Sequence, residues 1–175
     1  MRKNGQGYIR ARIRELNRTA NTIPVFVLID LDHPEPCPAD LIRQMLPTPH
    51  ATMLLFRVAV MEIESWVMAD REAFARFLGV ARNLVPDNPD NIADPKAEII
   101  SLARRSRRRE IRDDLVPVPG DIRKVGPAFN PRMIAFVENE WRLDEARAIS
   151  PSLNKAVERL QNAFRRRVHP LHPAQ

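Results

Sequence analysis

Two aspartates one residue apart, Asp30 and Asp32, end an apolar run and have the chemistry to bind a metal ion together. The run at residues 25–29 is typical of a buried strand in a parallel sheet. Side chains alternate along a strand, so both carboxylates point to one side at its carboxyl end, where open α/β sheets place ligands. Two carboxylates this close repel each other unless a cation, a proton or a basic group lies between them. Oxygen-only ligation favours Mg²⁺ or Mn²⁺. The alternative is that the aspartates only begin a loop and cap a turn.

A second acidic segment, at residues 61–70, follows another apolar run at residues 52–60 and is predicted to be helical. If the two strands are parallel neighbours, Glu62 or Glu64 arrives near the aspartate pair and is a candidate catalytic group. Residues two apart on a helix diverge by about 200°, so only one glutamate can face a metal. The other is then solvated or paired with an arginine such as Arg57. The alternative for both is an exposed position on an amphipathic helix.

The charge of the chain is unevenly distributed along its length. The net charge of +6 divides into +5 for residues 1–20, −6 for 21–100, +5 for 101–112 and +2 for 113–175. An enzyme that binds metal with carboxylates and phosphate with arginines has this pattern, and so do many solvated helix faces. The arginines predicted to bind nucleic acid are Arg10, Arg12, Arg14, Arg104, Arg105, Arg107, Arg108 and Arg109.

The composition favours a cytoplasmic, globular protein. The single cysteine, Cys37, excludes an internal disulfide framework and fits a reducing compartment. The sequence contains no stretch of about 20 apolar residues, and its first residues have no apolar signal-peptide core. A length of 175 residues is typical of one structural domain.

Periodicity and capping signals predict most of the elements. Helices are expected at residues 9–20, 39–45, 61–69, 70–79, 94–105 and 130–141 and from Ser150-Pro151 onward, with strands at 25–30 and 52–60. The predicted organisation is a partial α/β core at 1–80, a helical extension packed on it at 81–167, and a disordered tail at 168–175. An isolated two-stranded parallel sheet is not a stable core. We therefore expect a hidden third strand, a strand from another chain, or a polypeptide that begins partway into its domain, and we favour the last.

Three motifs together resemble one known family. They are Asp30-Leu31-Asp32, the segment from Arg57 to Asp70 with its two glutamates and Trp66, and Asp94-Pro95-Lys96. They resemble the bacterial TOPRIM-like family catalogued as domain of unknown function 4276, as do residues 5–10, 126–130 and 150–153. The resemblance implies a Rossmann-like fold with Mg²⁺ held by a first-strand glutamate and a later Asp-x-Asp. Asp30 and Asp32 match that pair, and Glu62 and Glu64 are candidates for further acidic positions. Lys96 is a candidate for stabilising developing charge.

The resemblance also implies a function. It predicts magnesium-dependent hydrolysis of phosphodiester bonds in DNA or RNA, a link to phage defence, a protein partner such as an ATPase, and an oligomer as one assembly state. The first-strand glutamate, expected upstream of residues 5–10, has no counterpart here, which predicts reduced or lost activity. The alternative is a non-catalytic basic protein that binds nucleic acid or a partner. A haloacid-dehalogenase phosphatase is disfavoured because Asp113-Asp114 does not follow an apolar strand.

Overall fold

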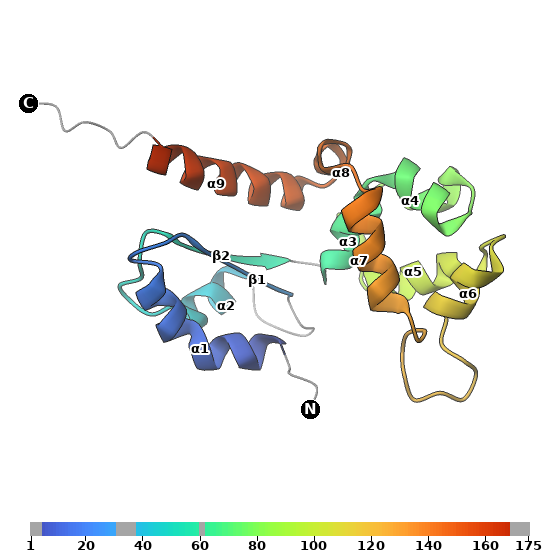
Figure 1. Cartoon of the computed structure of the whole chain (residues 1–175), viewed down its shortest axis with the longest axis horizontal. Helices are drawn as coiled ribbons and strands as arrows, with labels where there is room; N and C mark the ends of the chain where they lie inside the picture. Colours follow the sequence, from blue (N-terminus) through green and yellow to red (C-terminus); the bar gives the residue numbers. More distant parts are fainter. Residues whose placement is uncertain (1–4, 31–37, 60–61, 169–175) are drawn as a thin grey trace, which may run out of the picture. The chain divides into compact units, whose positions relative to one another are not determined.

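The computed structural model describes residues 5–30, 38–59 and 62–168, which form an α/β protein rich in helix (Figure 1). The chain divides into two compact units, residues 1–60 with 155–175 and residues 61–154. The sequence placed the division near residue 80. The division falls at residue 60 because the two helices that follow pack with the later helices, around Met68 and Phe74.

The first unit is built on a two-stranded parallel sheet. Its elements are α1 (Gly5–Thr19), β1 (Val25–Asp30), α2 (Pro38–Met45), β2 (Leu54–Ala59) and, from residue 155, α9 (Pro151–Val168). The register runs from Val25 opposite Leu54 to Asp30 opposite Ala59. β1 has the predicted bounds, whereas β2 is shorter than the predicted 52–60. Among the described residues these are the two strands of the sheet, and no third strand pairs with them.

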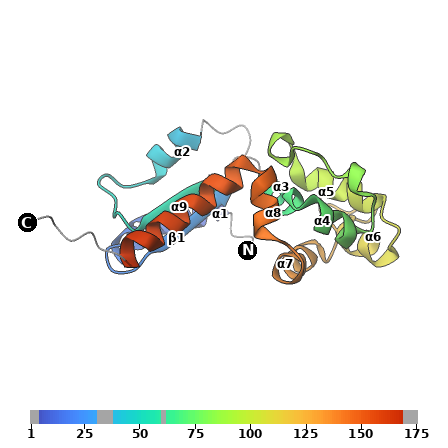
Figure 2. The same ribbon diagram turned by 90° about the horizontal axis from the view of Figure 1, so that it is seen from above.

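The two faces of this sheet differ in burial. Val27, Ile29 and Phe56 point to one face and are buried in a core that Ile13 of α1 and Leu41 of α2 complete. On the other face, Phe26 is 41% exposed. In both views α9 runs along the sheet, and in Figure 1 it lies on the side away from α1 (Figures 1 and 2). Apolar alternation along the strands thus creates one well-packed face and one partly open face.

All the regular secondary structure in the described residues of the second unit is helical. Its elements are α3 (Glu62–Ala69), α4 (Arg71–Leu78), η1 (Arg82–Leu84), η2 (Pro89–Asn91), α5 (Pro95–Arg104), α6 (Arg109–Leu115), α7 (Phe129–Asn139), α8 (Leu143–Ile149) and the start of α9. α6 and α8 had no separate prediction, because both are only seven residues long. The other helices lie within a few residues of their predicted bounds.

The predicted caps of two helices are confirmed. Asp70 is the N-cap of α4, and its carboxylate accepts a hydrogen bond from the N–H of Ala73 at 3.2 Å. Asp94 caps α5 in the same way, accepting from Ala97 N–H at 2.8 Å. Gly79 ends α4 with φ of 67°, a left-handed conformation that glycine adopts without the steric cost of a side chain. Local side-chain chemistry therefore sets where these helices begin and end.

Three phenylalanines form the centre of the second core. The ring of Phe136 in α7 lies 5.5 Å from that of Phe74 and 4.8 Å from that of Phe77, both in α4. The Phe74 and Phe136 rings meet edge to face, a favourable orientation for aromatic quadrupoles. Phe74 and Phe136 are almost completely buried. This cluster joins α4 to α7, which are far apart in the sequence.

A close backbone contact returns the long 116–128 connection to α6. The N–H of Gly126 donates to the carbonyl of Leu115 at 2.9 Å, and the N–H of Ala128 donates to that of Asp114 at 3.0 Å. A Cβ at position 126 would collide with the backbone of Asp114 and Leu115. Only glycine permits this approach. The contact closes the loop that begins at Val116.

Candidate functional site

Asp30, the first member of the predicted metal pair, lies at the carboxyl edge of the sheet. Asp30 is the last residue of β1 and stands opposite Ala59, the last residue of β2. The backbone therefore places this aspartate at the strand end where parallel sheets position ligands. Asp32 falls outside the described residues, as does Cys37. In the described part of the chain, no three His, Cys, Asp or Glu side chains gather as a metal site would require. The two-aspartate site stays a prediction.

The two candidate glutamates lie at the start of α3, in the second unit. Glu62 is the first residue of the helix, three residues after Ala59, and its side chain lies beyond the described part. The side chain of Glu64 is only 16% exposed, and its Oε1 lies 3.1 Å from Nζ of Lys96. Glu64 is thus largely buried, and not at the exposed position that an amphipathic helix would give it. It forms an ion pair with the lysine.

Lys96 is held by this ion pair in the first turn of α5. Its side chain is 35% exposed, so the pair is partly desolvated and its attraction exceeds that of a fully exposed pair. Lys96 and Glu64 were both candidate catalytic residues, and the fold brings them together. Each neutralises the charge of the other, so a role for Lys96 in stabilising an anion requires this pair to open.

Arg57 is a cation with no carboxylate partner among the residues that the structure describes. It lies on β2 opposite Leu28, and one of its terminal nitrogens donates to the carbonyl of Phe56. Its Nε is buried and has no hydrogen-bond partner among the described residues. Burial and the positive charge of Arg159 lower the pKa of Arg57 below its ordinary value. A half-buried guanidinium close to a second cation creates a positive potential that favours an anion.

The arginines of α1 form an exposed basic surface. The apolar residues Ile9 and Ile13 face the core, whereas the cations point outward. The guanidinium of Arg12 lies 4.6 Å from the ring centroid of Tyr8, within cation–π range. The exposed arginines on this helix are Arg10, Arg12, Arg14 and Arg18. All three of the α1 arginines predicted to bind nucleic acid are therefore accessible.

The second arginine cluster, which comprises the five arginines between positions 104 and 109, divides into two groups. Arg108 donates to the carbonyl of Phe77 at 3.3 Å, and Arg109 pairs with Asp113 at 3.3 Å. The side chains of Arg104, Arg105 and Arg107 are exposed, and within the described ranges they form neither a hydrogen bond nor an ion pair. Three of the five predicted residues are thus available to an anionic partner.

A serine inside this cluster fixes the turn, and the sequence did not single it out. Ser106 is 5% exposed, and its hydroxyl donates to the carbonyl of Leu78 at 2.5 Å. The same oxygen accepts from the N–H of Arg108 at 2.9 Å. The carbonyl of Ser106 accepts a hydrogen bond from the guanidinium of Arg112. A serine between basic residues is expected to be exposed to solvent. The hydrogen bond from Ser106 to Leu78 shows instead that this serine holds the turn against α4.

Asp70 has the most buried carboxylate among the described residues, and it stabilises the fold. Asp70 is 1% exposed, and its two oxygens accept from the guanidinium of Arg142 at 2.7 and 2.9 Å and from the Arg142 N–H at 2.9 Å. Burial acts to raise the pKa of Asp70, but the hydrogen bonds from Arg142 and Ala73 outweigh it and hold the pKa below its ordinary value. Asp70 is therefore charged, and both of its carboxylate oxygens accept hydrogen bonds.

Trp66 anchors the start of α9 through a hydrogen-bond network. Its indole N–H donates to the hydroxyl of Ser152 at 2.7 Å, and the N–H of Ser152 donates to Asp90 at 3.0 Å. The hydroxyl of Ser150 donates to the other oxygen of Asp90 at 2.7 Å. A carboxylate at a helix N-terminus satisfies free N–H groups and interacts favourably with the helix dipole. This network accounts for both serines of the Ser150-Pro151-Ser152 motif.

Comparison with protein-family models, with curated proteins and with solved structures finds no match for this chain. The resemblance to the TOPRIM-like family is therefore a prediction from the motifs alone. No helix in the described part of the chain combines the length and apolar character needed to cross a membrane.

Proposed function

We propose that this chain is a TOPRIM-like protein that hydrolyses phosphodiester bonds in nucleic acid, with Mg²⁺ or Mn²⁺ held by Asp30 and Asp32. The observation that carries the proposal is the position of Asp30 as the last residue of β1 in a parallel pair. An Asp-x-Asp at this strand end presents two hard oxygen donors to one side. A metal bound there would polarise a phosphate oxygen and lower the pKa of an attacking water.

The glutamates of α3 have different proposed roles. Glu62, the first residue of α3, is the proposed base that accepts a proton from water, a role that rests on the family resemblance. Glu64 is already paired with Lys96, so we propose that it positions the lysine. On this proposal, replacing Glu64 with glutamine lowers activity less than replacing Glu62 does.

Nucleic acid is the proposed substrate because many arginines are exposed and have no carboxylate partner in the described part of the chain. Those on α1 lie in the same unit as Asp30, where phosphate contacts would hold the backbone of the substrate. Arg57 adds a half-buried cation whose Nε has no partner in the described part of the chain. Binding through such contacts weakens as salt concentration rises, because it releases counterions from the nucleic acid. The family resemblance extends the proposal to a cytoplasmic role in phage defence with an ATPase partner.

A non-catalytic nucleic-acid-binding protein is the second candidate. The ion pair between Glu64 and Lys96 favours it, because that pair occupies two of the residues proposed for catalysis. On this reading the arginines bind phosphate, and the aspartates contribute no chemistry. The two candidates make opposite predictions for metal binding and the same prediction for nucleic-acid binding.

A calorimetric titration with Mg²⁺ and Mn²⁺ separates them. The samples are the wild type, the double variant Asp30→Asn with Asp32→Asn, and the control Asp40→Asn, which removes an α2 carboxylate that pairs with Arg43. Saturable binding that is lost in the double variant and kept in the control supports the enzyme. Such binding justifies cleavage assays on single-stranded DNA, duplex DNA and RNA. A folded wild type that binds neither metal leaves the non-catalytic candidate.

A further inference from the structure

A groove in the second unit is lined in part by Arg104, whose side chain has no ion-pair partner among the described residues. It has a volume of about 440 Å³ and lies between the end of α5, the helix α6 and the segment that follows it. Seven residues line it: Arg104, Arg112, Asp113, Val116, Pro117, Val118 and Pro119. The volume is within the range of small-ligand pockets. The groove thus combines two guanidinium groups with an apolar strip of valine and proline.

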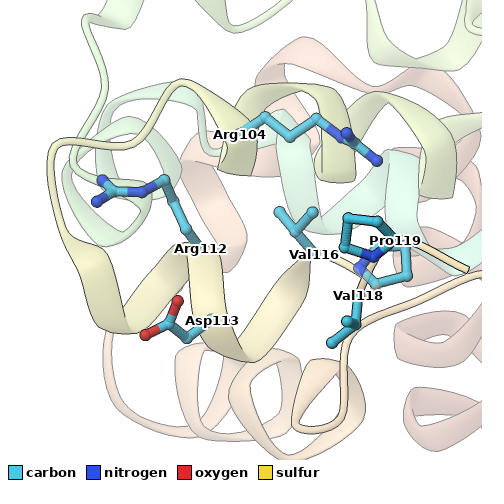
Figure 3. Close-up of a pocket in the computed structure, with 7 residues that line it drawn as sticks. Arg104, Arg112, Asp113, Val116, Val118 and Pro119 are labelled. Carbon is cyan, nitrogen blue, oxygen red and sulfur yellow. The ribbon is translucent and has the colours of Figure 1, made fainter. Parts of the chain in front are cut away.

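The two arginines of the groove have different surroundings. The side chain of Arg104 extends along the side where Val116 and Pro119 lie (Figure 3). It forms no hydrogen bond or ion pair with any residue of the described ranges. Arg112 points away from the apolar strip, and its guanidinium is held by the carbonyl of Ser106 (Figure 3). The Arg104 guanidinium therefore lies beside apolar side chains without a partner among the described residues. The Arg112 guanidinium is fixed by its hydrogen bond to Ser106.

The electrostatics of the groove favour an anion. Its single carboxylate, Asp113, is paired with Arg109 at 3.3 Å, which reduces its repulsion of a negative ligand. Arg105 and Arg107 lie close in sequence to Arg104, are exposed, and have no carboxylate partner among the described residues. Several cations with one neutralised acid give a positive local potential.

The apolar strip is held in place before any ligand arrives. The N–H of Val116 donates to the carbonyl of Arg112 at 3.1 Å, and the contact of Gly126 with Leu115 closes the loop. Pro117 and Pro119 restrict the backbone between these points. Val118 is 59% exposed, so the strip presents apolar surface to solvent. A preformed apolar surface beside a planar cation suits a flat ring that is attached to a negatively charged group.

We propose that this groove binds one nucleotide of single-stranded nucleic acid, with the base between the Arg104 guanidinium and the strip at Val116 and Pro119. Flanking phosphates then contact Arg112 and the exposed Arg105 and Arg107. A single strand is the occupant because its bases have accessible faces, whereas those of a duplex are stacked on their neighbours. The inference rests on the proposed function, since it names the form of nucleic acid that the same protein binds.

Fluorescence anisotropy with a labelled oligothymidine of 15 nucleotides tests the proposal. Arg104→Gln is compared with Arg76→Gln, which removes an exposed α4 arginine that forms no side-chain hydrogen bond or ion pair in the described structure. Both variants lose one positive charge. We expect Arg104→Gln to weaken binding about tenfold, because stacking of one base is worth roughly 1–3 kcal/mol. Arg76→Gln is expected to change it less than about twofold.

Arg104→Lys separates stacking from charge. It keeps the cation but loses the planar guanidinium, so we expect most of the tenfold loss to persist. A strand of abasic nucleotides is expected to bind the wild type more weakly than oligothymidine does, and a hairpin duplex is expected to bind more weakly still. Circular dichroism and thermal melting confirm that each variant is folded.

Three outcomes overturn the groove proposal. The first is an equal loss of affinity in Arg104→Gln and Arg76→Gln. The second is full affinity in Arg104→Lys, and the third is equal binding of abasic and thymidine strands. Each would show that the groove contributes only nonspecific charge. In these cases the wild type still binds nucleic acid, and the proposed function stands. A wild type that binds no nucleic acid overturns both. The metal titration is independent of every variant in this series.

Discussion

The two units of this protein differ in how their buried and partly buried charged side chains are paired. In the first unit, the arginines of α1 are exposed, and Arg57 is half-buried with no carboxylate partner in the described part of the chain. In the second unit, the buried Asp70 is bound by Arg142, and the partly buried Glu64 by Lys96. An unmet charge raises the free energy of the fold, whereas a paired one is neutralised. The comparison indicates that the buried charges of the helical unit stabilise its fold, whereas the exposed cations of both units are available for binding.

The cores of the two units also differ in how completely their aromatic side chains are buried. Phe74 and Phe136 in the second unit are buried from every side, and the first unit has a single well-packed sheet face. Phe26 on the other sheet face is 41% exposed, and Phe164 of α9 is 57% exposed. The comparison therefore makes definite predictions about substitutions in each unit.

The largest expected effect is that of Phe136→Ala. Removal of a fully buried ring that contacts Phe74 and Phe77 leaves a cavity, and we expect a loss of about 4 kcal/mol in the free energy of unfolding. The matched substitution Phe164→Ala is expected to cost less than about 0.5 kcal/mol, because that ring is mostly exposed. Urea denaturation of both variants measures the difference. Equal losses would contradict the contrast between the two cores.

Asp70→Asn is expected to have the next largest effect. It removes the charge that receives three hydrogen bonds from Arg142, and we expect a loss of about 3 kcal/mol in the free energy of unfolding. The control Asp144→Asn changes a side chain that is 93% exposed and is expected to be almost neutral. Chemical denaturation at neutral pH compares the two. A neutral Asp70→Asn would show that the buried pair contributes nothing to the stability of the second unit.

The contribution of Asp70 depends on pH in a definite direction. Its pKa in the folded protein is lower than its ordinary value, so the unfolded state binds a proton more readily than the folded state. The stabilisation is therefore complete above the unfolded pKa of about 3.9 and is lost as the pH falls through the folded pKa. We expect the stability difference between wild type and Asp70→Asn to narrow as the pH drops below about 4. A constant difference from pH 7 to pH 3 would argue against this assignment.

The smallest expected effect is the coupling between Glu64 and Lys96. A double-mutant cycle with Glu64→Gln and Lys96→Met is expected to give about 1 kcal/mol, since one partner is about one-third exposed. The same cycle on Arg109 and Asp113, an exposed pair, should give less than about 0.5 kcal/mol. Thermal or urea unfolding of the single and double variants supplies the values. Equal coupling in the two cycles would remove the distinction between a partly buried and an exposed pair.

Much of the local structure was predictable because its causes lie within a few residues. The apolar run at 25–30 predicted β1 with the correct bounds, and Asp70 and Asp94 predicted the starts of α4 and α5. Strand patterning and N-caps depend on near neighbours in the chain. The helix α6 had no separate prediction because its sequence is highly charged and only seven residues long.

Tertiary structure alone decided which charged groups are satisfied. Asp70 and Arg142 are 72 residues apart, and Trp66 and Ser152 are 86 apart, so no local pattern pairs them. The arginines between positions 104 and 109 are chemically identical, yet within the described ranges Arg108 and Arg109 have side-chain partners and Arg104 has none. The sequence by itself determined most of the helices, the positions of the two strands and the surplus of basic residues. Packing between distant segments determined which of those charges are left available to bind, because a partner is set by distance in space and not by position in the chain.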